Sequence, residues 1–109
     1  MDKKNILVVD DEKNIRTTLQ QMLEASGYTV ATAVNGEDSL SRLEETDFDM
    51  TLLDMKLPGI DGIEVIRQMR RRGIQVPVVM ITAYGTIENA VEAIVVGKKF
   101  VVICKRPTI

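Results

Sequence analysis

The chain contains no histidine and no tryptophan, a single cysteine, and few aromatic residues of any kind. Without histidine, a Ser-His or Cys-His nucleophile system cannot be built, and imidazole metal ligands are excluded. The lone cysteine, Cys104, rules out an intrachain disulfide and fits a reducing compartment. Acid–base, nucleophilic or metal-binding chemistry must therefore come from carboxylates, hydroxyls, lysine or this thiol.

Long apolar segments are missing as well. No apolar run reaches the roughly 20 residues that a membrane-spanning helix needs. The first residues, Met1–Lys4, lack the apolar stretch of a secretion signal. The net charge of −2 predicts no general affinity for nucleic acid or for an anionic membrane. We therefore expect a cytoplasmic protein that contacts neither a membrane nor nucleic acid directly.

The length and composition predict one folded domain. A chain of 109 residues fits a single domain, residues 1–109, with a core of workable size. With 45% apolar and 28% charged residues, it belongs among globular rather than disordered chains. The sequence contains no linker, internal repeat or low-complexity segment.

Five short runs have the composition of β-strands, and four of them are almost entirely apolar, as expected of parallel strands covered on both faces. The five runs are residues 6–9, 28–33, 50–53, 76–81 and 100–104. Between successive runs, apolar residues recur at helical spacing. The four expected helices contain Ile15–Leu23, Leu40–Leu43, Ile63–Met69 and Ile87–Ile94. Alternating strands and helices predict an α/β domain with an open parallel sheet and right-handed crossovers.

The end of the chain departs from this alternation. No acidic residue follows Glu92, and the sequence ends a few residues past the fifth run, so we expect no final helix. A doubly wound parallel sheet needs helices on both faces. We therefore expect one face to be undercovered, or to be covered by another chain.

Polar side chains stand where several expected strands end. In a parallel sheet these ends share one edge, where ligands bind. Two carboxylates about 5 Å apart repel by roughly 3 kcal/mol at an effective dielectric constant of about 20, so a cluster of them favours a bound cation. An all-oxygen ligand set suits Mg²⁺. The polar residues at strand ends are Asp10, Asp11, Glu12, Asp54, Thr82 and, after the fifth run, Lys105.

Asp54 has the position expected of a nucleophile toward phosphorus. A carboxylate can attack a phosphoryl group once a metal ion offsets the incoming negative charge. Thr82 and Lys105 would offer a hydroxyl and an ammonium group to the other phosphoryl oxygens.

Three motifs carry a family resemblance: Val9-Asp10-Asp11, the stretch from Leu53 to Gly62, and Thr82-Ala83-Tyr84-Gly85. With these motifs the chain resembles the receiver domains of bacterial two-component response regulators, the CheY-like superfamily, most closely over residues 5–94. The stretch MITAYGTIENAVEAI is most similar to receivers of enhancer-binding transcription activators and sporulation phosphorelays. The resemblance implies a flavodoxin-like sheet of strand order 2-1-3-4-5.

The resemblance also implies a mechanism. Asp54 would accept a phosphoryl group from a sensor histidine kinase or a histidine phosphotransfer protein. Asp11, Asp54 and the backbone carbonyl of Lys56 would hold Mg²⁺, and Asp10 would assist through water. Phosphoryl binding and switching would fall to Thr82, Ala83, Lys105 and Phe100. A downstream effector or output domain, for example in transcription control, would respond; dimerisation is left open.

The ending VVGKKFVVICKRPTI departs from the family pattern. Counting without gaps from Thr82 puts Cys104 at the family's lysine position and Val101 at its aromatic position. Lys105 takes the lysine position only if one residue is inserted. Separately, Phe100 could be a displaced aromatic switch. The sequence leaves both alignments open.

Other interpretations compete with a phosphoacceptor. The segment Asp10–Glu12 could be a solvated turn that caps the first helix. A phosphorylation-incompetent interaction module is a second alternative. A Mg²⁺-dependent phosphatase usually has Asp-x-Asp, but Lys56 stands at its second position here. We therefore expect a signalling module and not a conventional enzyme.

Overall fold

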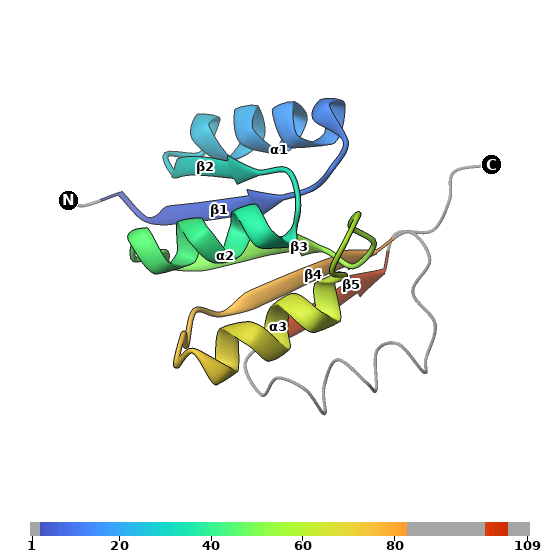
Figure 1. Cartoon of the computed structure of the whole chain (residues 1–109). Coiled ribbons are helices and arrows are strands. Elements are labelled where there is room, and N and C mark those ends of the chain that lie inside the picture. The colour runs from blue at the N-terminus through green and yellow to red at the C-terminus, as the bar shows by residue number, and fades with distance from the viewer. Residues whose placement is uncertain (1–2, 83–99, 105–109) are drawn as a thin grey trace.

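The structure, a computed structural model, describes residues 3–82 and 100–104. Within these residues the chain forms a five-stranded sheet of order β2-β1-β3-β4-β5, with all neighbouring strands parallel (Figure 1). The predicted flavodoxin-like fold and strand order are thus confirmed. The elements are β1 Asn5–Val9, α1 Lys13–Ala25, β2 Thr29–Ala33, α2 Gly36–Glu45, β3 Met50–Asp54, α3 Gly62–Arg71, β4 Val78–Thr82 and β5 Phe100–Cys104.

Most predicted strand boundaries agree with the structure to within one residue, but the start of β4 does not. The prediction began this strand at residue 76, but the strand begins at Val78. Proline has no N–H to donate to a sheet, so Pro77 contributes only its carbonyl, which accepts from Thr51 N at 2.9 Å. The predicted helix around Ile87–Ile94 and the stretch after Cys104, where we expected no final helix, lie outside the described residues.

Two of the three described helices have a side-chain N-cap. Asn35 caps α2, because its side chain accepts a hydrogen bond from Asp38 N at 2.8 Å. Asp61 caps α3 in the same way, accepting from Glu64 N at 2.9 Å. The N-cap of α1 is Glu12, which makes no side-chain capping bond. Among these helices, none combines the length and apolar character that crossing a bilayer requires.

Helices α2 and α3 cover one face of the sheet (Figure 1). The chain moves from β2 through β3 to β4 in one direction, and right-handed crossovers put both helices on the same side. Their buried side chains pack against alternate residues of β1, β3 and β4. The large side chains of this core that are fully buried are Leu7, Val9, Leu53, Val65, Ile66, Met69, Val78 and Met80.

Helix α1 lies on the opposite face, because the step from β1 to β2 runs in the reverse direction. Ile6 and Val8 of β1 are buried there. Helix α1 itself has no buried residue, and Met22 is 62% exposed. Among the residues that the structure describes, one helix lies on this face and two lie on the other; the predicted undercovered face depends on residues outside this range.

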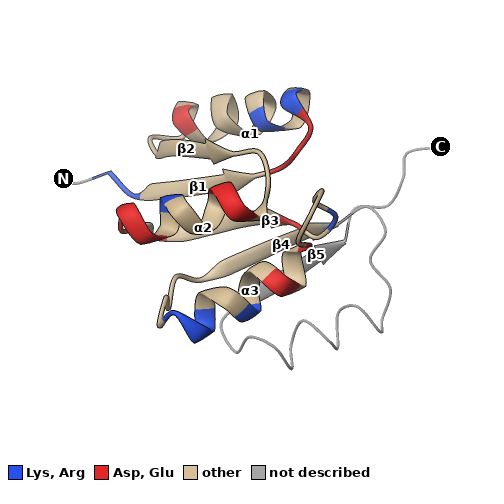
Figure 2. Cartoon of the chain, viewed as in Figure 1, with Lys and Arg blue, Asp and Glu red and all other residues tan. Residues whose placement is uncertain are grey.

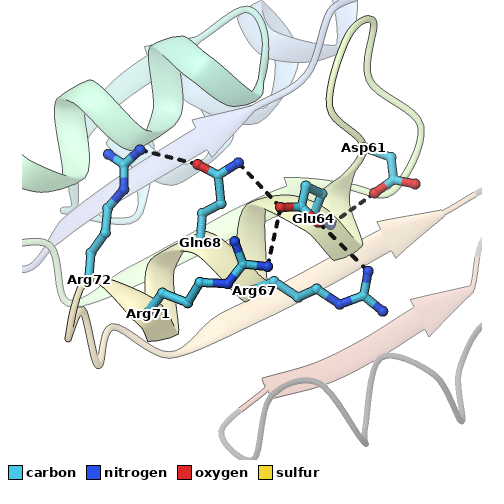
Figure 3. A network of polar contacts seen from close by, with 6 residues as sticks. All are labelled: Asp61, Glu64, Arg67, Gln68, Arg71 and Arg72. Atoms are coloured by element: carbon cyan, nitrogen blue, oxygen red, sulfur yellow. Dashed lines mark hydrogen bonds and ion pairs between the residues drawn. The ribbon is translucent and has the colours of Figure 1, made fainter.

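The arginine-rich end of α3 is part of a polar network on the outer surface of that helix (Figure 3). Glu64 forms ion pairs with Arg67 and Arg71 at 3.7 and 3.8 Å. Arg72 donates to Glu44 of α2 at 2.8 Å, which links the two helices. Arg70 and Arg71 lie in the last turn of α3, where positive charge complements the C-terminal end of the helix.

Candidate metal-binding site

Three carboxylates meet at the edge of the sheet where the parallel strands end. Asp10 and Asp11 follow β1 directly, and Asp54 is the last residue of β3. Because β1 and β3 are neighbours, with Val9 in register with Leu53, these ends lie side by side. Figure 2 shows the acidic segment after β1 beside the acidic end of β3. One oxygen from each carboxylate lies within 4.8 Å of the others.

This spacing makes the cluster electrostatically costly by itself. At such a separation each pair of charges repels by roughly 3 kcal/mol at an effective dielectric constant of about 20. Asp10 is only 8% exposed, whereas Asp54 is half-buried and Asp11 is exposed to solvent. A hard divalent cation would relieve this repulsion, and the all-oxygen donors fit Mg²⁺. The exposed side of the cluster leaves room for water or substrate oxygens.

Hydrogen bonds fix Asp10 through its amide, its side chain and its carbonyl. Its amide donates to Ala33 O at 3.2 Å, which ties it to the end of β2. Its carboxylate accepts from Glu12 N at 2.8 Å, and its carbonyl accepts from Arg16 Nη1 at 2.8 Å. The N-cap residue of α1, Glu12, makes no side-chain capping bond of its own, and its backbone N–H is bound by the Asp10 carboxylate.

Sequence reasoning missed Arg16. Its guanidinium reaches from the first turn of α1 back to the Asp10 carbonyl, so it braces the turn that carries two of the three acids. The available signal was its place in the first turn of a helix that follows an acidic loop. Such a position usually favours acidic residues, because they complement the N-terminal end of the helix.

Asp54 is followed by a loop, residues 55–61, that turns back over the end of β3. Lys56 N donates to Asp54 Oδ1 at 3.1 Å. Met55 N donates to Ile81 O of β4 at 3.1 Å, and Gly62 N donates to Met55 O at 2.9 Å. These bonds keep the Lys56 backbone beside the carboxylate cluster. Its carbonyl as a metal ligand stays a prediction.

The other predicted site residues are placed only in part. Thr82 is the last residue of β4 and is in register with Cys104, the last residue of β5. Phe100 is in register with Val78, at the other end of the same two strands. Ala83 and Lys105 lie outside the described residues. This register places Cys104 at the same edge of the sheet as Thr82, as the ungapped alignment predicts. The phosphoryl-binding roles of Thr82, Ala83 and Lys105 and the switch role of Phe100 stay predictions.

Comparison with known proteins identifies the family. Residues 6–105 match the family model described as the response regulator receiver domain. The chain is 50% identical over 80 residues to the alkaline phosphatase synthesis transcriptional regulatory protein PhoP of Bacillus subtilis, covering 73% of this chain and 33% of PhoP. It is 42% identical over 100 residues to the transcriptional regulatory protein ResD of the same organism, covering 89% of this chain and 41% of ResD.

Solved structures of receiver domains share the fold. The response regulator TrrA of Thermotoga maritima, solved in complex with Mg²⁺-BeF, superposes with a TM-score of 0.79 at 36% identity, over 92% of this chain and 86% of TrrA. The chemotaxis protein CheY4 of Vibrio cholerae gives a TM-score of 0.88 at 27% identity, over 98% of this chain and 90% of CheY4. The predicted resemblance is confirmed: the chain belongs to the response regulator receiver domain family.

Proposed function

We propose that Asp54 is the phosphoacceptor and that Asp10, Asp11 and Asp54 form its Mg²⁺ site. The observation that carries this proposal is the meeting of the three carboxylates, with one oxygen of each within 4.8 Å of the others, at the end of β3. A strand end fixes the nucleophile, while the loop after it leaves one side open. These 109 residues contain no histidine, so a phosphohistidine donor would lie outside them.

The proposed transfer is a displacement at phosphorus. An oxygen of Asp54 attacks the phosphorus, the bond from phosphorus to the donor's imidazole nitrogen breaks, and the imidazole leaves with that electron pair. The product is an acyl phosphate on Asp54. Mg²⁺, when bound, supplies the positive charge that lets a phosphoryl group approach this cluster.

The remaining roles follow the family pattern. Asp11, Asp54 and the Lys56 carbonyl would hold the ion, with Asp10 assisting through water. Thr82, Ala83 and Lys105 would bind the transferred oxygens, and Phe100 would be a displaced aromatic switch. Cys104, and not Lys105, is in register with Thr82 at the end of β5. The proposed phosphoryl-binding role of Lys105 therefore needs a test of its own.

The chain spans about a third of PhoP and about two fifths of ResD. We propose that residues 1–109 form a single receiver domain of a cytoplasmic regulator and do not act as a conventional enzyme. A sensor histidine kinase or a phosphotransfer protein would supply the phosphoryl group. The signal would pass to an output domain or a downstream effector, through changes at the surface of this domain or through dimerisation.

The direct test is incubation with acetyl phosphate and Mg²⁺, followed by intact mass measurement. The wild-type chain should gain one phosphoryl group, and Asp54→Ala should gain none. Asp47→Ala, which removes an exposed acid outside the cluster, is the matched control and should react like wild type. Omitting Mg²⁺ should abolish the reaction.

Two outcomes would favour the alternatives. No adduct on the wild-type chain, with partner binding unchanged in Asp54→Ala, would indicate a phosphorylation-incompetent interaction module. Repeated turnover of a general phosphomonoester would indicate a phosphatase.

A further inference from the structure

The first turn of α2 contacts the loop after Asp54 at a buried glycine. Gly36 does not have a positive φ, so its backbone conformation is open to any residue. A Cβ at this position would nevertheless lie 2.5 Å from Ile60 Cγ1 and 2.7 Å from Val65 Cγ2. Glycine within a helix costs up to about 1 kcal/mol relative to alanine. The reason for glycine here is therefore space for Ile60 and Val65.

A second contact joins the same two segments. Gly59 adopts a left-handed conformation, with φ of 77°, and a Cβ there would lie 3.2 Å from a carboxylate oxygen of Glu37. Glu37 is the residue after Gly36. The first turn of α2 thus touches two successive residues of the loop, Gly59 and Ile60.

The far end of the loop is packed just as closely. A Cβ on Gly62, which again has no positive φ, would lie 2.8 Å from the Asp54 carbonyl oxygen and 2.9 Å from Met55 Cα. These are backbone atoms, which cannot rotate away. The loop therefore has little freedom at the α3 end, and α2 restricts its outer part.

We propose that Gly36 is a positioning residue for the site: by admitting Ile60 against α2, it sets the path of the loop that carries Lys56. Gly36 has no side chain that could bind the ion, and it acts through the space that it leaves for Ile60. The proposal deepens the proposed function, since its effect on metal binding rests on the Lys56 carbonyl being a ligand. Displacement of the loop would move that carbonyl relative to the three carboxylates.

The test is Gly36→Ala, with two measurements. Mg²⁺ affinity, measured by calorimetric titration, should fall roughly tenfold, as is typical when support behind a metal ligand is lost. In the metal-free chain, hydrogen exchange at the Gly62 amide, which donates to Met55 O, should become faster. This second readout needs neither metal nor phosphorylation.

Gly73→Ala is the matched control. Gly73 has φ of 76° and open space around its Cβ position, so alanine there strains the backbone just beyond α3 without a clash. It should lower stability and leave Mg²⁺ affinity and Gly62 exchange unchanged. If the effects of Gly36→Ala came only from a general loss of stability, Gly73→Ala would lower Mg²⁺ affinity and speed Gly62 exchange in the same way. That result would overturn the proposal.

Substitutions of Ile60 test the same contact without a clash. Ile60→Ala alone should weaken Mg²⁺ binding severalfold, because the loop loses its contact with α2. In that background Gly36→Ala should cause a smaller further loss, because Cγ1 and Cδ1 of Ile60 are gone and, of the three nearest atoms, only Val65 Cγ2 still lies against the new Cβ. An equal loss in both backgrounds, or unchanged Gly62 exchange in Gly36→Ala, would overturn the proposal. Failure of the wild-type chain to bind Mg²⁺ would instead refute the proposed function.

Discussion

The two faces of the sheet hold the site by different means. On the face covered by α2 and α3, Leu53, Met80 and Met69 are fully buried, and the loop after Asp54 is fixed by close packing. On the α1 face, no residue of the helix is buried, and Met22 is 62% exposed. There the acidic turn is held chiefly by hydrogen bonds. The comparison indicates that close packing supports the loop after Asp54 in addition to its hydrogen bonds, whereas hydrogen bonds are the main support of Asp10.

The largest expected effect is a difference in the free energy of unfolding between two methionine-to-alanine variants, one on each face. Met69→Ala on α3 should lower the free energy of unfolding by about 2–5 kcal/mol, since it removes a fully buried side chain. Met22→Ala on α1 should change it by less than about 0.5 kcal/mol. Urea denaturation of both variants measures the difference. Equal losses would mean that α1 is packed as tightly as α3.

The hydrogen bonds that hold the acidic turn can be weakened separately. Arg16→Met removes the charged donor to the Asp10 carbonyl but keeps an apolar side chain, and should cost about 1.5 kcal/mol. Arg42→Met, which removes an exposed ion pair with Asp38 on α2, should cost at most about 0.5 kcal/mol. Chemical denaturation distinguishes them. If Arg16→Met costs no more than Arg42→Met, the Arg16 contact does not support the turn.

A smaller effect of opposite sign is expected within the covered face. Thr51 is fully buried in β3, and its hydroxyl has no hydrogen-bond partner. Thr51→Val keeps the shape and removes the unsatisfied group, so it should stabilise the chain by about 1 kcal/mol. Thr32→Val, at a half-buried position on the α1 face, should change stability little. A destabilised Thr51→Val variant would show that the hydroxyl is satisfied in solution.

The sequence was sufficient for the features that depend on local pattern. Apolar runs that stop at Asp10 and Asp54 predicted both the strands and the edge where these acids meet, because parallel strands end on one side. Three features could not be predicted from the sequence. Arg16 and Ile60 act through contacts that only the packed elements create. The start of β4 followed from the missing N–H of Pro77, which the apolar run concealed.

The most direct test of the account is the response of stability to Mg²⁺ in the wild-type chain and in Asp11→Asn. Three clustered carboxylates should make the metal-free wild type less stable than Asp11→Asn, which removes one of the repelling charges. Mg²⁺ at a hundredfold excess over its dissociation constant should stabilise the wild type by about 2.7 kcal/mol and the variant much less. Urea denaturation with EDTA and with Mg²⁺ gives all four values. Wild-type stability that does not respond to Mg²⁺, or an equal response in Asp11→Asn, would contradict the proposed metal site.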